Sequence, residues 1–205
     1  MNNALDRRDP CAAYYDANAE EYSAATLQID MNPIRSRFLR NVPPGARILD
    51  AGCGSGRDTV AFQRSGYSVT AFDASAKMAE FASRNTGQEC AVLRFQDMTF
   101  ERKFDAVWSC AALLHVPKSE MSDVLGRIVR ALKPGGVAYF SFIEGNDERT
   151  SSDGRFYNSY TTELLRELLH DVGGVREVDC WTSFRNPDSP RQAPWLNMII
   201  QRTTP

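Results

Sequence analysis

The segment Ile48-Leu-Asp-Ala-Gly-Cys-Gly-Ser-Gly-Arg-Asp58 runs from a short apolar stretch into a loop with glycines at positions 52, 54 and 56. An apolar run that ends in a glycine-rich turn before a helical pattern is typical of a nucleotide-cofactor loop between a strand and a helix. Glycines adopt backbone angles closed to other residues, and without Cβ atoms they let a ligand approach the main chain. We therefore predict that Gly52, Cys53, Gly54 and Gly56 form a cofactor-binding loop.

The glycine spacing separates this loop from the dinucleotide fingerprint G-x-G-x-x-G, which brings a pyrophosphate to the N-terminus of a helix. Here the spacing is G-x-G-x-G, Arg57 follows the third glycine, and Asp50 ends the apolar run. A carboxylate directed into the loop suits a cationic group better than a pyrophosphate. S-adenosylmethionine carries an ammonium and a sulfonium at this end and no phosphate there, so Asp50 favours that cofactor.

Four further segments follow the glycine loop in order along the chain. They are Val69-Thr-Ala-Phe-Asp73, Phe95-Gln-Asp-Met98, Phe104-Asp-Ala-Val-Trp-Ser-Cys110 and Leu132-Lys-Pro-Gly-Gly136. Together with the loop they resemble the motifs of the class I S-adenosylmethionine-dependent methyltransferases, over roughly residues 47–142. The chain is also loosely similar to small bacterial methyltransferases of the tellurite-resistance type.

The resemblance implies which residues bind S-adenosylmethionine and its product, S-adenosylhomocysteine. Asp73, followed by Ala74, ends a predicted strand about 20 residues after the glycine loop, the distance at which an acid reaches ribose hydroxyls. The Asp97 carboxylate is expected to bind the exocyclic amine of adenine, and the Met98 backbone amide the adenine ring. Tyr22 lies in a helix that resembles the cap of small methyltransferases, where it either touches the methionine end or anchors the helix to the core.

The acceptor side is predicted from residues near the carboxyl ends of later strands. His115 follows the fourth strand, where similar methyltransferases often carry a histidine near the transferred methyl, so it is the catalytic candidate. The alternative is that it orders the loop before Pro117. Arg155, Tyr157 and Tyr160 follow a polar insert and are predicted to line the substrate pocket, with Arg155 either holding an anionic group or standing as a solvated loop charge.

Composition bounds the class of protein and its partners. At 205 residues and 42% hydrophobic, the chain is expected to form one domain over residues 1–205, with cap helices in 1–44 and the core in 45–205. A net charge of -2 with both signs interspersed offers neither a basic stripe for nucleic acid nor a polybasic run for a membrane. With 2 histidines in the chain, no metal site is expected.

The expected compartment is the cytoplasm. The 5 cysteines form no C-x-x-C pair and their number is odd, which favours reduced thiols. Neither an apolar stretch of signal-peptide length at the N-terminus nor a run long enough to span a membrane is found in the sequence. The chain is expected to be a monomer or a homodimer.

Hydrophobic periodicity predicts alternating strands and helices, which implies an α/β fold with a parallel sheet. Helices are predicted at residues 11–23, 33–40, 57–65, 75–84, 122–132 and 160–170, and strands at 47–50, 68–73, 91–96, 104–110, 136–142, 175–183 and 195–202. Residues 185–194 contain three prolines and are expected to form an extended loop. The resemblance implies a Rossmann-like, doubly wound, seven-stranded sheet of order 3-2-1-4-5-7-6, with strand 7 antiparallel.

These observations predict an S-adenosylmethionine-dependent methyltransferase that alkylates an oxygen, nitrogen or sulfur atom of a small molecule. An RNA or protein substrate is the alternative within the same class of enzyme. A nicotinamide-dependent oxidoreductase is disfavoured by Asp50 and by the lack of a Tyr-x-x-x-Lys or comparable hydride-transfer set. A non-catalytic cofactor-binding subunit is the third alternative, and the acceptor itself stays open because many functions share one fold.

Overall fold

The computed structural model describes residues 10–184 and 193–204, so residues 185–192 of the predicted proline-containing loop lie outside its description. The helices are α1 (Pro10–Ala17), α2 (Ala19–Leu27), α3 (Asn32–Leu39), α4 (Arg57–Arg64), α5 (Ala76–Thr86), α6 (Lys118–Ala131) and α7 (Thr162–Val172). The strands are β1 (Arg47–Ala51), β2 (Ser68–Asp73), β3 (Ala91–Val92), β4 (Phe104–Ser109), β5 (Leu132–Glu144), β6 (Glu148–Thr150), β7 (Phe156–Tyr160), β8 (Val175–Ser183) and β9 (Trp195–Arg202).

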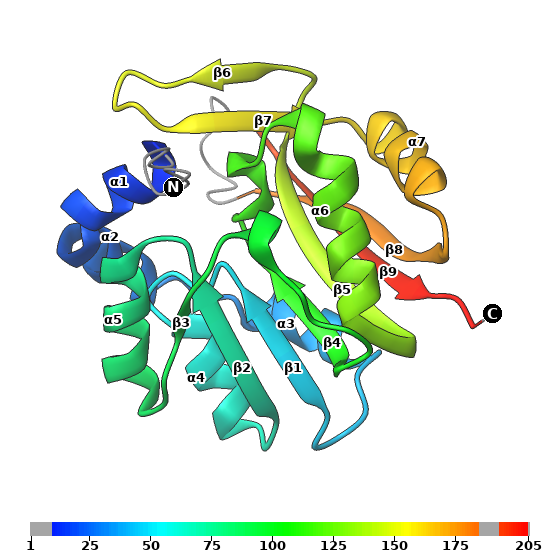
Figure 1. Ribbon diagram of the computed structural model, residues 1–205, viewed down its shortest axis with the longest axis horizontal. Coiled ribbons are helices and arrows are strands. Elements are labelled where there is room, and N and C mark those ends of the chain that lie inside the picture. Colours follow the sequence, from blue (N-terminus) through cyan, green and yellow to red (C-terminus); the bar gives the residue numbers. More distant parts are fainter. Residues whose placement is uncertain (1–9, 185–192, 205) are drawn as a thin grey trace, which may run out of the picture.

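The central sheet has the order β3-β2-β1-β4-β5-β9-β8 (Figure 1). Its first five strands are parallel, and β9 runs antiparallel to both β5 and β8. The predicted sixth and seventh strands are β8 and β9, so the predicted order 3-2-1-4-5-7-6 and the antiparallel last strand are confirmed. Asp50 pairs in register with Ala71 of β2 and Trp108 of β4, which brings the carboxyl ends of three strands to one edge.

Local sequence explains where the helices next to this edge begin and end. α4 starts after Gly56, which has φ +79°, and α5 starts at Ser75, whose hydroxyl accepts a hydrogen bond from the Met78 amide at 3.1 Å. α5 ends at Gly87 in the left-handed conformation. Of the two threonines that competed as the cap of α7, Thr161 is the one that accepts a hydrogen bond, from the Leu164 amide.

Several predicted elements differ in the structure, among them the helix predicted at 122–132, which begins earlier, at Lys118, as α6. The predicted helix over residues 11–23 is split into α1 and α2 at Asn18, whose side-chain amide donates to the Tyr14 carbonyl at 2.8 Å and so competes with helical bonding. The predicted strand over residues 91–96 is a two-residue strand followed by the short 3₁₀ turn η1 (Phe95–Asp97). The predicted strand 136–142 is extended at both ends, as β5.

The polar insert and the segment after it form a hairpin, β6–β7, where the sequence predicted a loop. The three residues of β6 are all exposed, so no alternation of apolar and polar residues marks that strand in the sequence. The hairpin continues the sheet, because Ile143 and Glu144 of β5 pair with Ser159 and Tyr160 of β7. In Figure 1 it lies beyond the carboxyl ends of the parallel strands, facing α1 and α2.

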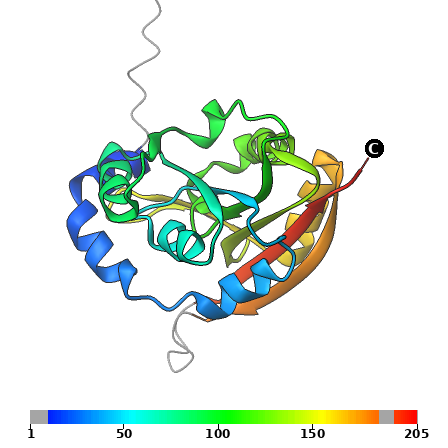
Figure 2. The ribbon, with the colours of Figure 1, turned by 90° about the horizontal axis from the view of Figure 1, so that it is seen from below.

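Helices cover both faces of the sheet (Figure 2). On one face, α6 and α7 bury a large apolar cluster that includes Ile128 and Leu165. On the other, Phe38 of α3 and Phe62 of α4 pack against Trp108 with ring centroids 5.2 and 5.4 Å apart. Each such buried side chain contributes roughly 1.5–3 kcal/mol, so these layers hold the strand ends in place.

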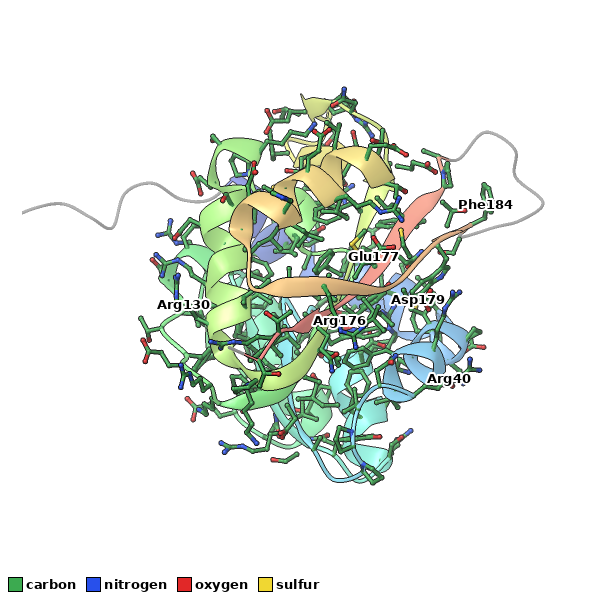
Figure 3. The ribbon with its side chains drawn as sticks, turned by 90° about the vertical axis from the view of Figure 1, so that its right-hand side faces the viewer. Arg40, Arg130, Arg176, Glu177, Asp179 and Phe184 are labelled. Atoms are coloured by element: carbon green, nitrogen blue, oxygen red, sulfur yellow. The ribbon has the colours of Figure 1, made fainter. Side chains whose placement is uncertain are left out.

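β8 forms one edge of the sheet, and charged side chains lie along it (Figure 3). Arg176 and Glu177 are exposed, while Asp179 forms a bidentate ion pair with Arg37 of α3 at 2.5 and 2.7 Å. Charges of this kind protect an edge strand from pairing with another chain.

None of the helices within residues 10–184 and 193–204 is long and apolar enough to cross a membrane. In the same part of the chain, no group of three or more His, Cys, Asp or Glu side chains is placed to hold a metal ion.

Candidate cofactor and acceptor site

A cavity of about 970 Å³ lies at the carboxyl ends of β1, β2 and β4, between the sheet, helices α1 and α2, and the β6–β7 hairpin. This volume is at the upper end of the roughly 300–1,000 Å³ of ligand pockets. Its wall includes Asp50, Gly54 and Asp73 from β1, β2 and the glycine loop, and His115 and Tyr157 from the segment after β4 and from β7. The cavity therefore joins the predicted cofactor residues to the predicted acceptor residues.

The three glycines of the loop serve different purposes. All have positive φ, at +76° for Gly52, +53° for Gly54 and +79° for Gly56. A Cβ atom on Gly52 would stand 2.4 Å from the Cβ of Ala112, and one on Gly56 would stand 2.8 Å from Thr86 Cγ2. A Cβ on Gly54 would meet no protein atom within 4 Å. Gly54 is thus the glycine whose open side leaves room for a ligand, whereas the other two are required by packing.

This difference predicts separable effects of two alanine substitutions. Gly52→Ala is expected to destabilise the protein by about 2–4 kcal/mol, because overpacking and a left-handed alanine each cost roughly 1–3 kcal/mol. Gly54→Ala is expected to cost about 1–2 kcal/mol of stability but to weaken ligand binding in the cavity, where the new methyl group would stand. Urea denaturation and calorimetric titration with S-adenosylhomocysteine measure the two effects. Equal loss of stability in both variants would contradict the assignment.

Cys53 of the glycine loop lines the cavity and is buried beside Cys90. Its pKa is raised well above the ordinary value of a thiol, by a hydrogen bond with Cys90 and by burial. The same contact lowers the pKa of Cys90 to about 7. Cys53 is therefore held as a neutral thiol in the wall, and its backbone amide donates to the Phe72 carbonyl at 2.9 Å.

Asp73 is held at the end of β2 by two backbone amides. Gly54 N–H donates to Oδ2 at 2.8 Å and Ser75 N–H donates to Oδ1 at 2.9 Å. Burial raises the pKa of this carboxyl to about 6, against the opposing effect of these amides. Ala74 lies beside it in the cavity wall. Asp73 thus ties the glycine loop to the start of α5 and has a second acceptor site on each oxygen for a ligand hydroxyl.

Asp50 lies deeper in the wall. Its side chain accepts a hydrogen bond from the Thr59 hydroxyl at 2.5 Å, and the residue is buried. Burial, and then the negative charge of Asp58, raises the pKa of Asp50 to about 8. A cationic group in this part of the cavity would favour the ionised form of Asp50 by direct attraction.

Sequence reasoning missed a cluster of buried charges beside Asp50. Arg35 Nη1 donates to Asp58 Oδ1 at 2.5 Å, Arg57 Nη2 donates to Asp58 Oδ2 at 2.7 Å, and the Trp108 indole donates to the same oxygen at 3.1 Å. Two guanidinium groups therefore share one carboxylate, and Arg57 lines the cavity. The sequence places Arg57 and Asp58 side by side after the third glycine, but Arg35 and Trp108, the other two partners of Asp58, come from distant segments.

Neither of the two predicted adenine residues, Asp97 and Met98, lines the cavity. Asp97 has a side chain that is 50% exposed and forms an ion pair with Arg94 at 2.7 Å, which lowers its pKa. Met98 does not line the cavity: its backbone amide donates to the Phe95 carbonyl at 3.2 Å, and its side chain is buried in the core with residues of α6. Because residues 95–97 form a 3₁₀ turn rather than the end of a strand, Phe95 and Gln96 face the cavity instead.

The cap helices bring aromatic side chains over the cavity. Tyr22 of α2 lines it, and its ring lies 4.9 Å from that of Tyr15 in α1 in an edge-to-face arrangement. Burial raises the pKa of Tyr22 above the ordinary tyrosine value. His115 lies in the short turn η2 (Leu113–His115), where its Nε2 is 2.9 Å from the Tyr15 hydroxyl and its Nδ1 is 2.7 Å from the Phe156 carbonyl. His115 therefore contacts both α1, through Tyr15, and β7, through Phe156.

The predicted substrate residues are divided by the structure. Arg155 and Tyr157 line the cavity, with the Arg155 guanidinium 4.3 Å from the ring centroid of Tyr14 and paired with Asp153 at 2.5 Å. Arg155 is therefore a half-buried, paired cation rather than a freely solvated loop charge. Tyr160 lies in the core instead, 4.9 Å from the ring of Phe142, because the β7 strand alternates its side chains between two faces.

The chain is similar to known methyltransferases. A family model described as a methyltransferase domain matches residues 48–136. The ubiquinone biosynthesis O-methyltransferase of Nitrosococcus oceani is 33% identical over 123 residues, which are 56% of this chain and 51% of that protein. The malonyl-(acyl-carrier protein) O-methyltransferase of Erwinia pyrifoliae is 34% identical over 161 residues, or 74% of this chain and 58% of that protein.

Among solved structures, a 1,6-didemethyltoxoflavin-N1-methyltransferase from Burkholderia thailandensis, with bound 1,6-didemethyltoxoflavin and S-adenosylhomocysteine, has a similar fold. Its TM-score is 0.78 at 24% identity, and the match covers 100% of this chain and 94% of that chain. The chain spans about half the length of the curated relatives that it matches. With the strand order and the glycine loop described above, these similarities show that the chain belongs to the class I S-adenosylmethionine-dependent methyltransferase family.

Proposed function

We propose that the protein is an S-adenosylmethionine-dependent methyltransferase that acts on a small-molecule acceptor. The observation that carries this proposal is the position of Asp73, which two backbone amides hold at the open side of Gly54 in the cavity wall. The space beside Gly54 leaves room for a ribose, and the neighbouring Asp73 carboxylate can accept hydrogen bonds from the ribose hydroxyls. Asp50 and Arg57 lie on the same wall and suit an ammonium and a carboxylate.

The residues fit S-adenosylmethionine when their charges are compared with its groups. Asp73 would hold the ribose, Asp50 the ammonium and Arg57 the carboxylate of the methionine end. Phe95 and Gln96 line the same cavity and would meet the adenine in place of Asp97 and Met98. When bound, the cofactor supplies a methyl group activated by a positive sulfur. The protein's task is then to orient the acceptor and to exclude water.

The acceptor half of the cavity supports a small molecule. It is enclosed by α1 and α2 and by the hairpin, and its wall includes Tyr14, Tyr157, Trp195 and Asn197. The two curated relatives are named O-methyltransferases. An RNA or protein acceptor would have to enter the cavity between helices α1 and α2 and the β6–β7 hairpin. The single-domain organisation, the cytoplasmic location and the oligomeric state stay predictions.

The first test is calorimetric titration of the protein with S-adenosylhomocysteine and, separately, with NADH. We expect micromolar affinity for S-adenosylhomocysteine and no heat with NADH. The control is Asp50→Asn, which keeps the shape of the side chain and removes the charge. Binding of NADH alone would contradict the proposal and favour an oxidoreductase, and binding of neither by the folded protein would favour a non-catalytic fold.

The same titration should depend on pH in a defined direction. In the free protein the pKa of Asp50 is about 8, so the carboxyl is mostly protonated at pH 6 and mostly ionised above pH 8. Only the ionised form attracts an ammonium, so binding below pH 8 must first release a proton. Affinity is expected to rise by up to about tenfold per pH unit between pH 6 and 8. Asp50→Asn should lack this rise, and a wild-type affinity that falls over this range would refute the assignment.

A further inference from the structure

Three groups from three separate elements meet at the acceptor side of the cavity. They are the Phe156 carbonyl of β7, the His115 imidazole of η2 and the Tyr15 hydroxyl of α1. A carbonyl oxygen only accepts hydrogen bonds, so His115 must carry its proton on Nδ1, 2.7 Å from that oxygen. In the neutral ring Nε2 is then an acceptor, and the Tyr15 hydroxyl at 2.9 Å donates to it.

This arrangement depends on the packing of α1 against the hairpin. The Phe156 amide donates to Cys11 Sγ at 3.2 Å, and the Arg155 guanidinium lies on the Tyr14 ring. These contacts join α1 to β7 and to the residue before it, so Tyr15 reaches His115 only when the cap helix is docked.

Aromatic rings and one guanidinium group lie next to Tyr15 and His115. The ring of Tyr157 lies 5.0 Å from that of His115, and the ring of Tyr22 lies 4.9 Å from that of Tyr15. The guanidinium of Arg155 lies 6.0 Å from the Tyr15 ring centroid. Both Tyr15 and His115 also line the cavity, so an acceptor bound there reaches the pair directly.

We propose that Tyr15 and His115 act together as the proton acceptor for an aromatic hydroxyl, with the Phe156 carbonyl as the group that positions the histidine. This inference rests on the proposed function and adds the acceptor class and a second catalytic residue. The aromatic class follows from the rings of Tyr14, Tyr157 and Trp195 in the wall, which offer stacking or edge contacts to a flat acceptor. A base is useful only where the reacting atom carries a proton that must leave.

The proton and electron changes balance. Methyl transfer to a hydroxyl breaks the carbon–sulfur bond with its electron pair left on sulfur, while a lone pair of the acceptor oxygen forms the new carbon–oxygen bond. The acceptor proton passes to the Tyr15 oxygen as the Tyr15 proton passes to His115 Nε2. His115 becomes an imidazolium whose Nδ1–H still donates to the Phe156 carbonyl, and Tyr15 ends as a neutral phenol.

The protonation of His115 can be read by NMR without any acceptor. The chain has 2 histidines, and the other, His170, has a side chain that is 89% exposed, so His170→Gln assigns the spectrum. In ¹⁵N-labelled protein saturated with S-adenosylhomocysteine, we expect His115 to be protonated on Nδ1 and unprotonated on Nε2 at neutral pH. Tyr15→Phe should shift the Nε2 resonance, whereas Tyr14→Phe should not. A proton on Nε2, or an unmoved resonance in Tyr15→Phe, would overturn the proposal.

The second arm measures methyl transfer to two phenols. One is a nitrophenol that is largely ionised at neutral pH, and the other is an alkylphenol of similar size that keeps its proton. His115→Gln is expected to slow methylation of the alkylphenol about 10²–10⁴-fold and to change that of the nitrophenol much less. Equal losses on both, or no methylation of either by the wild type, would refute the inference.

The two proposals fail in different ways. If S-adenosylhomocysteine does not bind, the proposed function is wrong. If it binds but His115 carries its proton on Nε2, the methyltransferase assignment stands and the Tyr15–His115 base is removed.

Discussion

Replacing Asp73 by alanine is expected to weaken S-adenosylhomocysteine binding by a factor of about 10²–10⁴. The carboxylate is the candidate partner of two ribose hydroxyls, and hydrogen bonds to a charged group are each worth about 1.5–3 kcal/mol. The variant also loses the acceptor of the Gly54 and Ser75 amides, which hold the loop against α5. Calorimetric titration measures the effect, and circular dichroism establishes that the variant is folded.

The matched control is Asp97→Ala. The sequence assigned Asp97 to adenine, whereas the structure places its side chain outside the cavity in an ion pair with Arg94. We expect its affinity to stay within about twofold of wild type, since an exposed pair contributes under about 1 kcal/mol to stability and does not reach the ligand. A large loss in Asp97→Ala with little loss in Asp73→Ala would reverse the two assignments.

Replacing Asp58 by alanine is expected to lower the free energy of unfolding by about 3–5 kcal/mol. The change leaves Arg35 and Arg57 without the carboxylate that both share, and an unpaired buried charge carries a large desolvation penalty. The side chains of Arg35 and Asp58 are only 11% and 6% exposed, so water cannot replace the lost partner easily. The Trp108 indole loses its acceptor as well. Urea denaturation monitored by tryptophan fluorescence measures the loss.

The control for this effect is Asp123→Ala on the outer face of α6. Asp123 pairs with Arg127 one helical turn away, at 2.7 Å, but its side chain is 57% exposed. Exposed pairs of this spacing contribute roughly 0.3–0.5 kcal/mol, so the variant should be almost as stable as wild type. A loss below about 1 kcal/mol in Asp58→Ala would mean that the buried cluster contributes little to stability.

The elements that the sequence predicted correctly have local signals. Ser75 caps α5 and Gly87 ends it, as the pattern of a serine before an apolar run and a glycine after it indicates. The strands of the sheet are apolar runs between such helices. The hairpin β6–β7 was missed because the exposed β6 has no apolar face. Its backbone pairing with β7 leaves no pattern of apolar residues in the sequence.

Among the candidate site residues, the positions of Asp50 and Asp73 in the cavity wall could be predicted, because the loop motif and its distance to the next strand end fix both at the ends of strands. Tyr15 could not, because its contact with His115 spans 100 positions and depends on how α1 docks. The same reason applies to the buried charge cluster, since Arg35 and the indole of Trp108 reach Asp58 only in the packed core. Tyr160 was misassigned because strand alternation, which the loop prediction ignored, sends its ring into the core.

The sequence by itself determined the fold class, the order of the strands once the family resemblance was added, and the side of the sheet on which a ligand binds. These depend on backbone propensity and on motifs that span a few residues. Only the tertiary structure decided that Gly54 is the glycine with space for a ligand and which side chains share Asp58. It also decided that Tyr15 of α1 contacts His115 in the turn after β4. Those are contacts between distant segments, and their geometry follows from packing, which no local pattern encodes.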